Sequence, residues 1–510
     1  MKKDPLDKWL YFLIIVMGVY FLIRIIDQTK MISIFPLVNN DLGSYVAQLH
    51  MLKICGFHNF CPYWYNGFIT FLISSPGWQF FTYPLYLMFN NILFSTYISN
   101  ILMYTIGFIF IYYLGKGQKF SRIKIIAFFV IMFGNSINIG NFIFQGRMSS
   151  LNATVFFLGL AAVIYFYKSH KIDKKFILFF VPINVLVILS HYQEAALAQV
   201  LVLSLFLIKK GYEKIIITLS FILSLILSAF WWVPFLLESF NLKQSSILIN
   251  EQGKWLAGQI IPKIEFSTQF FTTLLIIIIP IVLFMTFYFY WISKKKSFKI
   301  LIFYSPILIL NLLFWLRLTA YIPLLKHISP DPFLIFFLFF ILITFFKTNF
   351  KFFPKILRTL IISFLIILPL ANVIVSHTQT PYWDTFEYGL IEKNILSLLD
   401  VINPNEKFVF VSRLPFDKVR YSSYYYAYAT IYKNLSTPGG YYYHIASPDY
   451  RKGLHQILDE KNCSNIRNIM YQYNTSYAIG YGEKCNILGD CGFERIKKEG
   501  DACLYRLNNL

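Results

Sequence analysis

The sequence predicts a polytopic α-helical membrane protein with about eleven transmembrane helices and an extracytoplasmic C-terminal α+β domain. Three observations support this fold class. The 510 residues are 57% hydrophobic and only 14% charged, with a mean hydropathy of +0.57. Apolar runs of about 18 residues or more recur through the first three quarters of the chain. Short basic clusters separate these runs in an alternating pattern.

The apolar runs predict the positions of the membrane spans. The first run follows the basic segment MKKDPLDK and has no small-residue cleavage pattern, which predicts an uncleaved signal anchor. The predicted spans are 9–26, 97–114, 124–138, 149–167, 176–190, 194–208, 214–232, 270–292, 299–315, 333–347 and 357–375.

The net charge of +21 is explained by the loops between spans. Lysines and arginines precede span one and follow spans two, four, six, eight and ten, whereas the other connections are poor in basic residues. The positive-inside rule therefore predicts a multi-pass protein of the cell membrane with a cytoplasmic N-terminus and its C-terminus outside. Membrane lipids are the expected partners, and a nucleic-acid partner is not expected.

The six cysteines all fall in segments that this topology places outside. An even number of cysteines on an oxidising face predicts disulfides. Cys55 and Cys61 are close enough in sequence to close a small loop. The four in the tail, Cys463, Cys485, Cys491 and Cys503, allow three pairings. Because the chain has no C-x-x-C motif, a zinc site is not expected.

The first outer loop, residues 27–96, is too long to be a simple connection. Asp41, Tyr45 and Gln48 have the spacing of one helical face, with apolar residues on the other, which predicts a helix lying in the membrane interface. Asp41 has two explanations that are compatible with each other: an N-cap, or a catalytic or metal-binding carboxylate. His50 follows Asp41 by nine residues. On a straight helix it faces the side opposite Asp41, so a structural role is favoured for His50. A metal site shared by Asp41 and His50 would need a break in the helix between them.

Aromatic residues fill the second half of this loop. The segment 62–68 (PYWYNGF) includes Trp64, and a second aromatic segment follows at 76–84. Their rings suit either a membrane–water boundary or stacking on sugars.

Further polar residues are predicted at the outer face. His191 and Glu194 are spaced i, i+3 after span five, which is compatible with metal binding, although Ser190 and Gln193 also form a capping-box pattern there. Arg147 and Arg317 are candidates to bind a lipid phosphate. The alternatives for the two arginines are snorkelling, or pairing with an outer carboxylate such as Asp331.

The chain divides into a transmembrane domain, 1–375, and a tail domain, 376–510. In the tail the charge rises and the long apolar runs stop. A helix is predicted at 387–402 and strands at 407–413, 476–481 and 502–507. The many tyrosines of the tail, at 421–428 and 441–443, are predicted to be mostly buried in a sheet, with a glycan-binding surface as the alternative. No glycine-rich nucleotide loop follows a strand, which argues against a nucleotide-sugar donor.

Several short motifs of the first loop and of span seven resemble one family. They are Asp41-x8-His50, Trp64-x2-Gly67, Tyr83-Pro84-x-Tyr86 and the segment FWWVPFL at 230–236. Together they resemble the GT-C superfamily of polyprenyl-phosphate-sugar-dependent glycosyltransferases. Within it they are most similar to the prokaryotic 6-pyruvoyl-tetrahydropterin-synthase-related membrane proteins. The resemblance covers about residues 9–375.

The resemblance implies a hexosyl- or pentosyltransferase that takes its sugar from a polyprenyl-phosphate carrier at the outer face and passes it to a lipid, glycan or protein acceptor. Asp41 matches the family's first-loop acid, which acts as general base or helps to bind a divalent metal, Mg or Mn. Glu194 is the second candidate metal ligand, and Arg147 and Arg317 are the candidates for the donor phosphate. The candidates for positioning or acceptor-site roles are His50, His191, Glu194, Tyr45 and Trp64.

Two other functions stay open on the sequence. Many relatives carry a second acidic motif in the next outer loop, but residues 138–147 contain no acid. This departure leaves a non-catalytic GT-C-like scaffold as an alternative. A transporter or flippase of lipid-linked glycans is the other, although the inner halves of the spans show almost no polar residues and no inverted repeat is evident.

Overall fold

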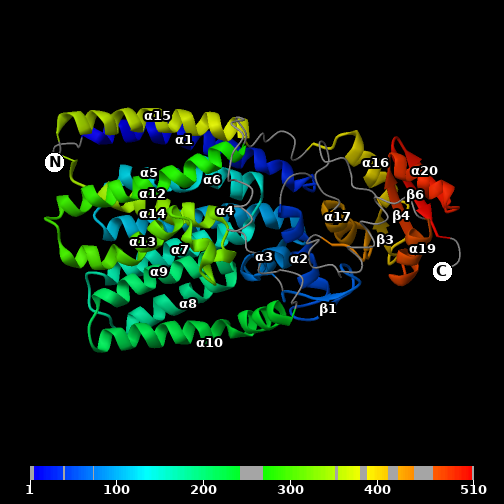
Figure 1. Cartoon of the computed structure of the whole chain (residues 1–510), viewed down its shortest axis with the longest axis horizontal. Helices are drawn as coiled ribbons and strands as arrows, with labels where there is room; N and C mark the ends of the chain where they lie inside the picture. Colours follow the sequence, from blue (N-terminus) through cyan, green and yellow to red (C-terminus); the bar gives the residue numbers. More distant parts are fainter. Residues whose placement is uncertain are drawn as a thin grey trace.

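The computed structural model describes residues 5–37, 41–72, 74–241, 268–350, 354–379, 387–411, 423–440 and 463–507. Long helices run side by side in one bundle, and a small domain with a β-sheet lies at one end of it (Figure 1). The N-terminus lies at the opposite end of the bundle from this domain. The sequence-based fold class is therefore confirmed: a mainly helical protein with several apolar spans and a C-terminal domain that contains a sheet.

Ten of the eleven predicted spans lie on one helix each, and 124–138 covers two consecutive helices, Arg122–Gly134 and Ser136–Asn138. Eight of the described helices are long and apolar enough to cross a membrane, and a ninth span results if Arg122–Gly134 and Ser136–Phe144, bent by 45°, are counted together. The two helices that follow α7 have only 17 residues each, so eleven crossings stay a prediction. The bundle helices are α1 (Pro5–Asp27), α4 (Ile92–Gly117), α5 (Arg122–Gly134), α7 (Met148–Tyr167), α8 (Lys174–Ser190), α9 (Tyr192–Ile208), α10 (Tyr212–Asn241), α12 (Thr268–Ser293), α13 (Phe298–Trp315), α14 (Pro330–Lys347) and α15 (Lys355–Gln379).

Burial separates the centre of the bundle from its lipid-facing rim. Helix α7 is central, because 83% of its most apolar 18-residue segment is buried inside the protein. For α15 the buried share of the corresponding segment is 22%. Exposed isoleucines such as Ile15, Ile226 and Ile367 lie on the outer helices. An apolar surface of this kind is stable only against lipid or another apolar phase, which agrees with a membrane-embedded bundle.

The first outer loop folds against both the bundle and the tail. It contains a 3-10 turn η1 (Gln28–Ile32), α2 (Leu42–Ile54), the short hairpin β1 (Phe60–Cys61) and β2 (Phe68–Ile69), and α3 (Gly77–Phe89). A disulfide joins Cys55 to Cys61. Helix α2 packs against α3, α4 and the tail helix α17, and both its polar and its apolar faces are buried. It lies inside the protein, which corrects the prediction of a helix on the membrane surface.

The tail domain is built on a four-stranded mixed sheet of order β3-β4-β6-β5. The strands are β3 (Phe408–Phe410), β4 (Tyr477–Tyr481), β5 (Glu494–Glu499) and β6 (Ala502–Arg506). β3 and β4 are parallel, with Phe408 opposite Tyr477, and the other two pairs are antiparallel. The helices are α16 (Leu390–Leu399), α17 (Ser423–Lys433), α19 (Cys463–Gln472) and α20 (Glu483–Asp490).

Two disulfides complete the tail. Cys463 is joined to Cys491, and Cys485 to Cys503, which resolves the three pairings that the sequence allowed. The tail tyrosines were assigned to the wrong element, because those at 424–428 lie on α17. Tyr424, Tyr425 and Tyr426 are buried there. The tyrosines at 421 and 441–443 lie outside the described residues.

The first loop and the tail share a network of hydrogen bonds. The backbone N–H groups of Tyr65 and Asn66 donate to the carbonyls of Gly439 and Thr437, and the N–H of Thr437 donates to Tyr63 O. The indole of Trp64 donates to Thr430 Oγ1 on α17 at 3.1 Å. The motif at 62–68 is therefore the joint between the membrane bundle and the tail.

Candidate functional site

Asp41 stands directly before α2 but does not cap it. Its carboxylate makes no capping hydrogen bond with the helix, so the explanation of Asp41 as an N-cap alone is wrong. Its backbone N–H donates to Gln145 O at 2.5 Å. Asp41 Oδ2 lies 3.6 Å from Arg147 Nε, and the Asp41 side chain is 41% exposed. Asp41 thus presents a partly accessible carboxylate beside an arginine.

The second outer loop brings Arg147 to this place. A π-helical turn, η2 (Ile139–Phe144), follows the short α6 (Ser136–Asn138) and ends the bent span. The chain then turns at Gly146, whose φ is +61°. A Cβ at Gly146 would lie 2.6 Å from Leu42 Cβ. Only glycine therefore allows the loop to come this close to the first turn of α2.

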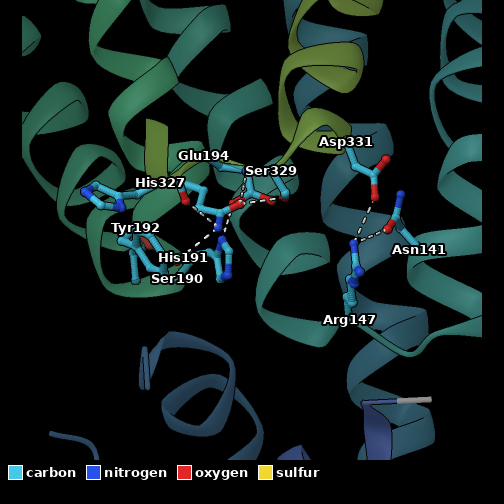
Figure 2. Close-up of polar contacts among 11 residues, drawn as sticks. Asn141, Arg147, Ser190, His191, Tyr192, Glu194, His327, Ser329 and Asp331 are labelled. Carbon is cyan, nitrogen blue, oxygen red and sulfur yellow. Dashed lines mark hydrogen bonds and ion pairs between the residues drawn. The ribbon is translucent and has the colours of Figure 1, made fainter. Parts of the chain in front are cut away.

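Arg147 is held between two carboxylates. Its Nη1 donates to Asp331 Oδ2 at 3.0 Å and to Asn141 Oδ1 at 2.7 Å (Figure 2). Its Nε faces Asp41. Asp331 belongs to the first turn of α14. Burial alone would lower the pKa of Arg147, but the charges of Asp331 and Asp41 raise it above its usual value. The predicted alternative, pairing of an outer arginine with Asp331, is confirmed for Arg147.

Glu194 and His191 form a second polar cluster on the other side of the start of α14 (Figure 2). His191 Nδ1 is hydrogen-bonded to Glu194 Oε2, and Glu194 is only 7% exposed. Ser190 ends α8, where its hydroxyl donates to Leu186 O, so the capping-box alternative is wrong. The carboxylate of Glu194 thus has a histidine partner and lies below the surface.

Gln193 links this second cluster to Asp331. Its Nε2 donates to His327 O at 3.1 Å, and its Oε1 accepts from Ser329 N–H and Ser329 Oγ at 3.2 and 2.9 Å. Ser329 precedes α14, so Gln193 fixes the position from which Asp331 reaches Arg147. A cavity of about 10 Å³ between Glu194 and Pro332 has room for roughly one water. The sequence indicated Gln193 only as part of a capping box and did not indicate Asn141, because single amides on helical turns have no distinctive spacing.

Other predicted residues lie apart from the Asp41–Arg147–Asp331 group. His50 faces α3, with Nδ1 3.4 Å from Tyr86 Oη, and burial, then Lys53, lower its pKa. Because α2 is continuous, no break brings His50 back to Asp41. Trp64 is 1% exposed and bonded to the tail, so its position does not fit the predicted acceptor site.

Tyr45 and Arg317 have different surroundings. Tyr45 is buried on α2 in an edge-to-face contact with Trp78, and its electrostatic coupling to Arg147 places it near the group. Arg317 precedes the 3-10 turn η3 (Leu318–Tyr321), with a φ of 60°. The next turn, η4 (Leu325–His327), leads to Ser329 and α14. A phosphate-binding role for Arg317 stays a prediction.

The two predicted metal ligands, Asp41 and Glu194, have different partners in the structure. Asp41 belongs to the arginine group, and Glu194 is bonded to His191. Within the described ranges, no three histidine, cysteine, aspartate or glutamate side chains are placed to hold a metal ion.

Comparison with known proteins identifies the fold. No protein-family model and no curated protein matches the sequence. Among solved structures, an Archaeoglobus fulgidus oligosaccharyltransferase tethered to an acceptor peptide matches with a TM-score of 0.56 and 10% identity, over 91% of this chain and 69% of that one. ArnT from Cupriavidus metallidurans bound to undecaprenyl phosphate matches with a TM-score of 0.53 and 9% identity, over 98% of both chains.

A third similar structure is the mycobacterial arabinofuranosyltransferase AftD. Its TM-score is 0.56 at 8% identity, and the match covers 97% of this chain but 40% of that one. At such low identities the likeness shows the fold, which is that of the GT-C glycosyltransferases.

Proposed function

We propose that this protein is a membrane glycosyltransferase that takes a sugar from a polyprenyl-phosphate carrier and passes it to a hydroxyl of a lipid, glycan or protein. The observation that carries the proposal is the exposed carboxylate of Asp41 beside a fixed guanidinium, on a GT-C fold. Structures with this fold include one bound to undecaprenyl phosphate and one in complex with dolichol phosphate. The sugar class, hexosyl or pentosyl, follows from the family resemblance alone.

The chemistry is a single displacement at the anomeric carbon. Asp41 removes the proton of the acceptor hydroxyl as the new glycosidic bond forms and the bond to the carrier phosphate breaks. Arg147 Nη2 makes no hydrogen bond within the described residues, so it is able to donate to the departing phosphate and stabilise its charge. Arg317 is a second candidate for this phosphate.

We propose that the reaction takes place at the outer face of the cell membrane. Lys168, Lys299 and Lys347 approach one another at one end of the bundle. The six cysteines form disulfides in the first loop and in the tail, at the other end. Basic loops on the cytoplasmic side and disulfides on the oxidising side support an extracytoplasmic tail and site. Membership of the narrower family related to 6-pyruvoyl-tetrahydropterin synthase stays a prediction.

The test is transfer of labelled sugar from a polyprenyl-phosphate-sugar pool in membranes that contain Asp41→Asn or wild-type protein at matched levels. Loss of a general base predicts a decrease of about 10²- to 10⁴-fold. Glu387→Gln is the matched control, because the Glu387 side chain is 72% exposed and its ion pair with Lys30 is long at 3.9 Å. Equal transfer by wild type and Asp41→Asn would remove Asp41 from the mechanism.

One alternative has a specific observation in its favour. The polar residues of 138–147 are two asparagines, a glutamine and an arginine, where many relatives carry an acid, as expected of a scaffold that has lost catalysis. Transfer by neither form, with the pool and several acceptor classes supplied, would favour this scaffold function over an enzyme.

A further inference from the structure

Two carboxylates from distant parts of the chain share one cation at the candidate site. Asp41 comes from the first outer loop, and Asp331 begins α14. They contact different nitrogens of the same guanidinium, at 3.6 Å for Nε and 3.0 Å for Nη1. The formal charge of the three side chains together is −1. A divalent ion held by the same two carboxylates would neutralise them completely.

The guanidinium is fixed by more than charge. Arg147 N–H donates to Asn141 O at 3.0 Å, and Asn141 Oδ1 accepts from Nη1 of the same arginine. Gly146 seats the preceding turn against Leu42, and Gln193 fixes the approach to α14. A snorkelling arginine needs none of these contacts, because water and headgroups satisfy its charge.

The residues present do not fit a divalent metal. Magnesium and manganese take several oxygen ligands in near-octahedral geometry. The two carboxylates nearest the proposed reaction both face a side chain that stays protonated at any physiological pH. Glu194, the other predicted ligand, is bonded to His191. A metal would have to displace the guanidinium from Asp331 and then remain close to it, against the repulsion of like charges.

We propose that Arg147 is the resident cation of this site and takes the place of a divalent metal, so that the reaction proceeds without one. The catalytic part of this inference rests on the proposed function. The occupancy of the cation position by Arg147 is independent of that function. The arginine provides positive charge and directed N–H donors for a departing phosphate. A chelator cannot remove them.

The test is direct binding of Mn²⁺ to the purified full-length protein, followed by electron paramagnetic resonance and by thermal unfolding. Wild type is expected to show no Mn²⁺ binding that depends on Asp41, and therefore the same result as Asp41→Asn. Arg147→Met leaves the two carboxylates without their cation. It is expected to gain a weak site, with a dissociation constant of about 10⁻³ M or tighter. This site is expected to be absent from Arg147→Met/Asp331→Asn.

The outcomes separate this inference from the proposed function. Mn²⁺ binding to wild type that is lost in Asp41→Asn would overturn the inference even if Arg147→Met failed to fold. A folded Arg147→Met without the new site would also overturn it. Because no substrate is present, these results stand whether or not transfer is found. If transfer is found, wild type is expected to keep its full rate after EDTA treatment, and a rate that falls on chelation and returns with Mn²⁺ would count against the inference.

Discussion

Gly146 determines where Arg147 can lie. Its φ of +61° is in the left-handed region, and its Cα faces Leu42 at the start of α2. The adjacent carbonyl of Gln145 accepts the N–H of Asp41. One turn therefore places a carboxylate from the first loop and a guanidinium from the second side by side.

We expect Gly146→Ala to destabilise the protein and to reduce transfer. A Cβ would meet Leu42 Cβ at 2.6 Å, and overpacking typically costs about 1–3 kcal/mol in addition to the strain of the positive φ. Gly211→Ala is the matched control, since Gly211 has a φ of +48° but nothing within 4 Å of its Cβ position. Thermal unfolding in detergent measures the difference. Equal losses in both variants would show that the contact with α2 has no effect.

The sequence predicted the individual residues of the site better than their partners. Asp41 stood out by its position in the long first outer loop, and Arg147 because basic residues are sparse in the outer connections. The contact between Arg147 and Asp331 joins residues 184 positions apart, and the sequence offered it only as one of two alternatives. Gln193 and Asn141 act through hydrogen bonds to backbone and side chains, which follow no sequence period. These contacts needed the folded structure.

At the scale of elements, the aromatic segment 62–68 makes backbone hydrogen bonds that no sequence pattern predicts. Its rings suited a membrane boundary, yet its N–H and C=O groups pair with residues 437–439 of the tail. The prediction also missed β5 (Glu494–Glu499), whose sequence ERIKKE has no apolar alternation. This strand lies at the edge of the sheet, where charged residues protect against unwanted pairing.

Substitution of Trp64 tests the joint between the first outer loop and the tail. We expect Trp64→Ala to cost about 3–5 kcal/mol, because it empties a buried site and leaves Thr430 without its donor. Release of the tail in limited proteolysis should become much faster. Trp315→Ala is the matched control, since Trp315 is 42% exposed at the end of α13. If the two variants release the tail at the same rate, the joint does not depend on Trp64.

At the scale of the whole molecule, hydrophobicity and charge were sufficient to place the helices. Ten of the eleven predicted spans each coincide with one helix, and 124–138 covers α5 and the short α6, because a bilayer requires long apolar segments with internally paired backbones. The number that cross is harder to predict. Helices of 17 residues, such as α8 and α9, are shorter than the roughly 20 residues of a full span.

The sidedness of the molecule gives a further prediction. A reporter that is active only outside the cytoplasm should be active when inserted after Gly500, in the β5–β6 turn, and inactive after Lys295, between α12 and α13. Both positions are exposed turns with positive φ, so local structure is matched. The reason is the positive-inside rule, because Lys295 lies in a cluster of lysines. The opposite pattern of activity would invert the topology and move the site to the cytoplasmic face.

The hydrogen bond between Trp64 and Thr430 also has a consequence for how the protein is made. Its two residues are 366 positions apart. At a synthesis rate of about 5–20 residues per second, roughly 20 to 70 seconds pass between the appearance of one partner and that of the other. During this time the aromatic joint has no tail to cover it, and a chain interrupted after α15 would never cover it. We therefore expect that biogenesis requires this early segment to be kept soluble until the last quarter of the chain has been synthesised.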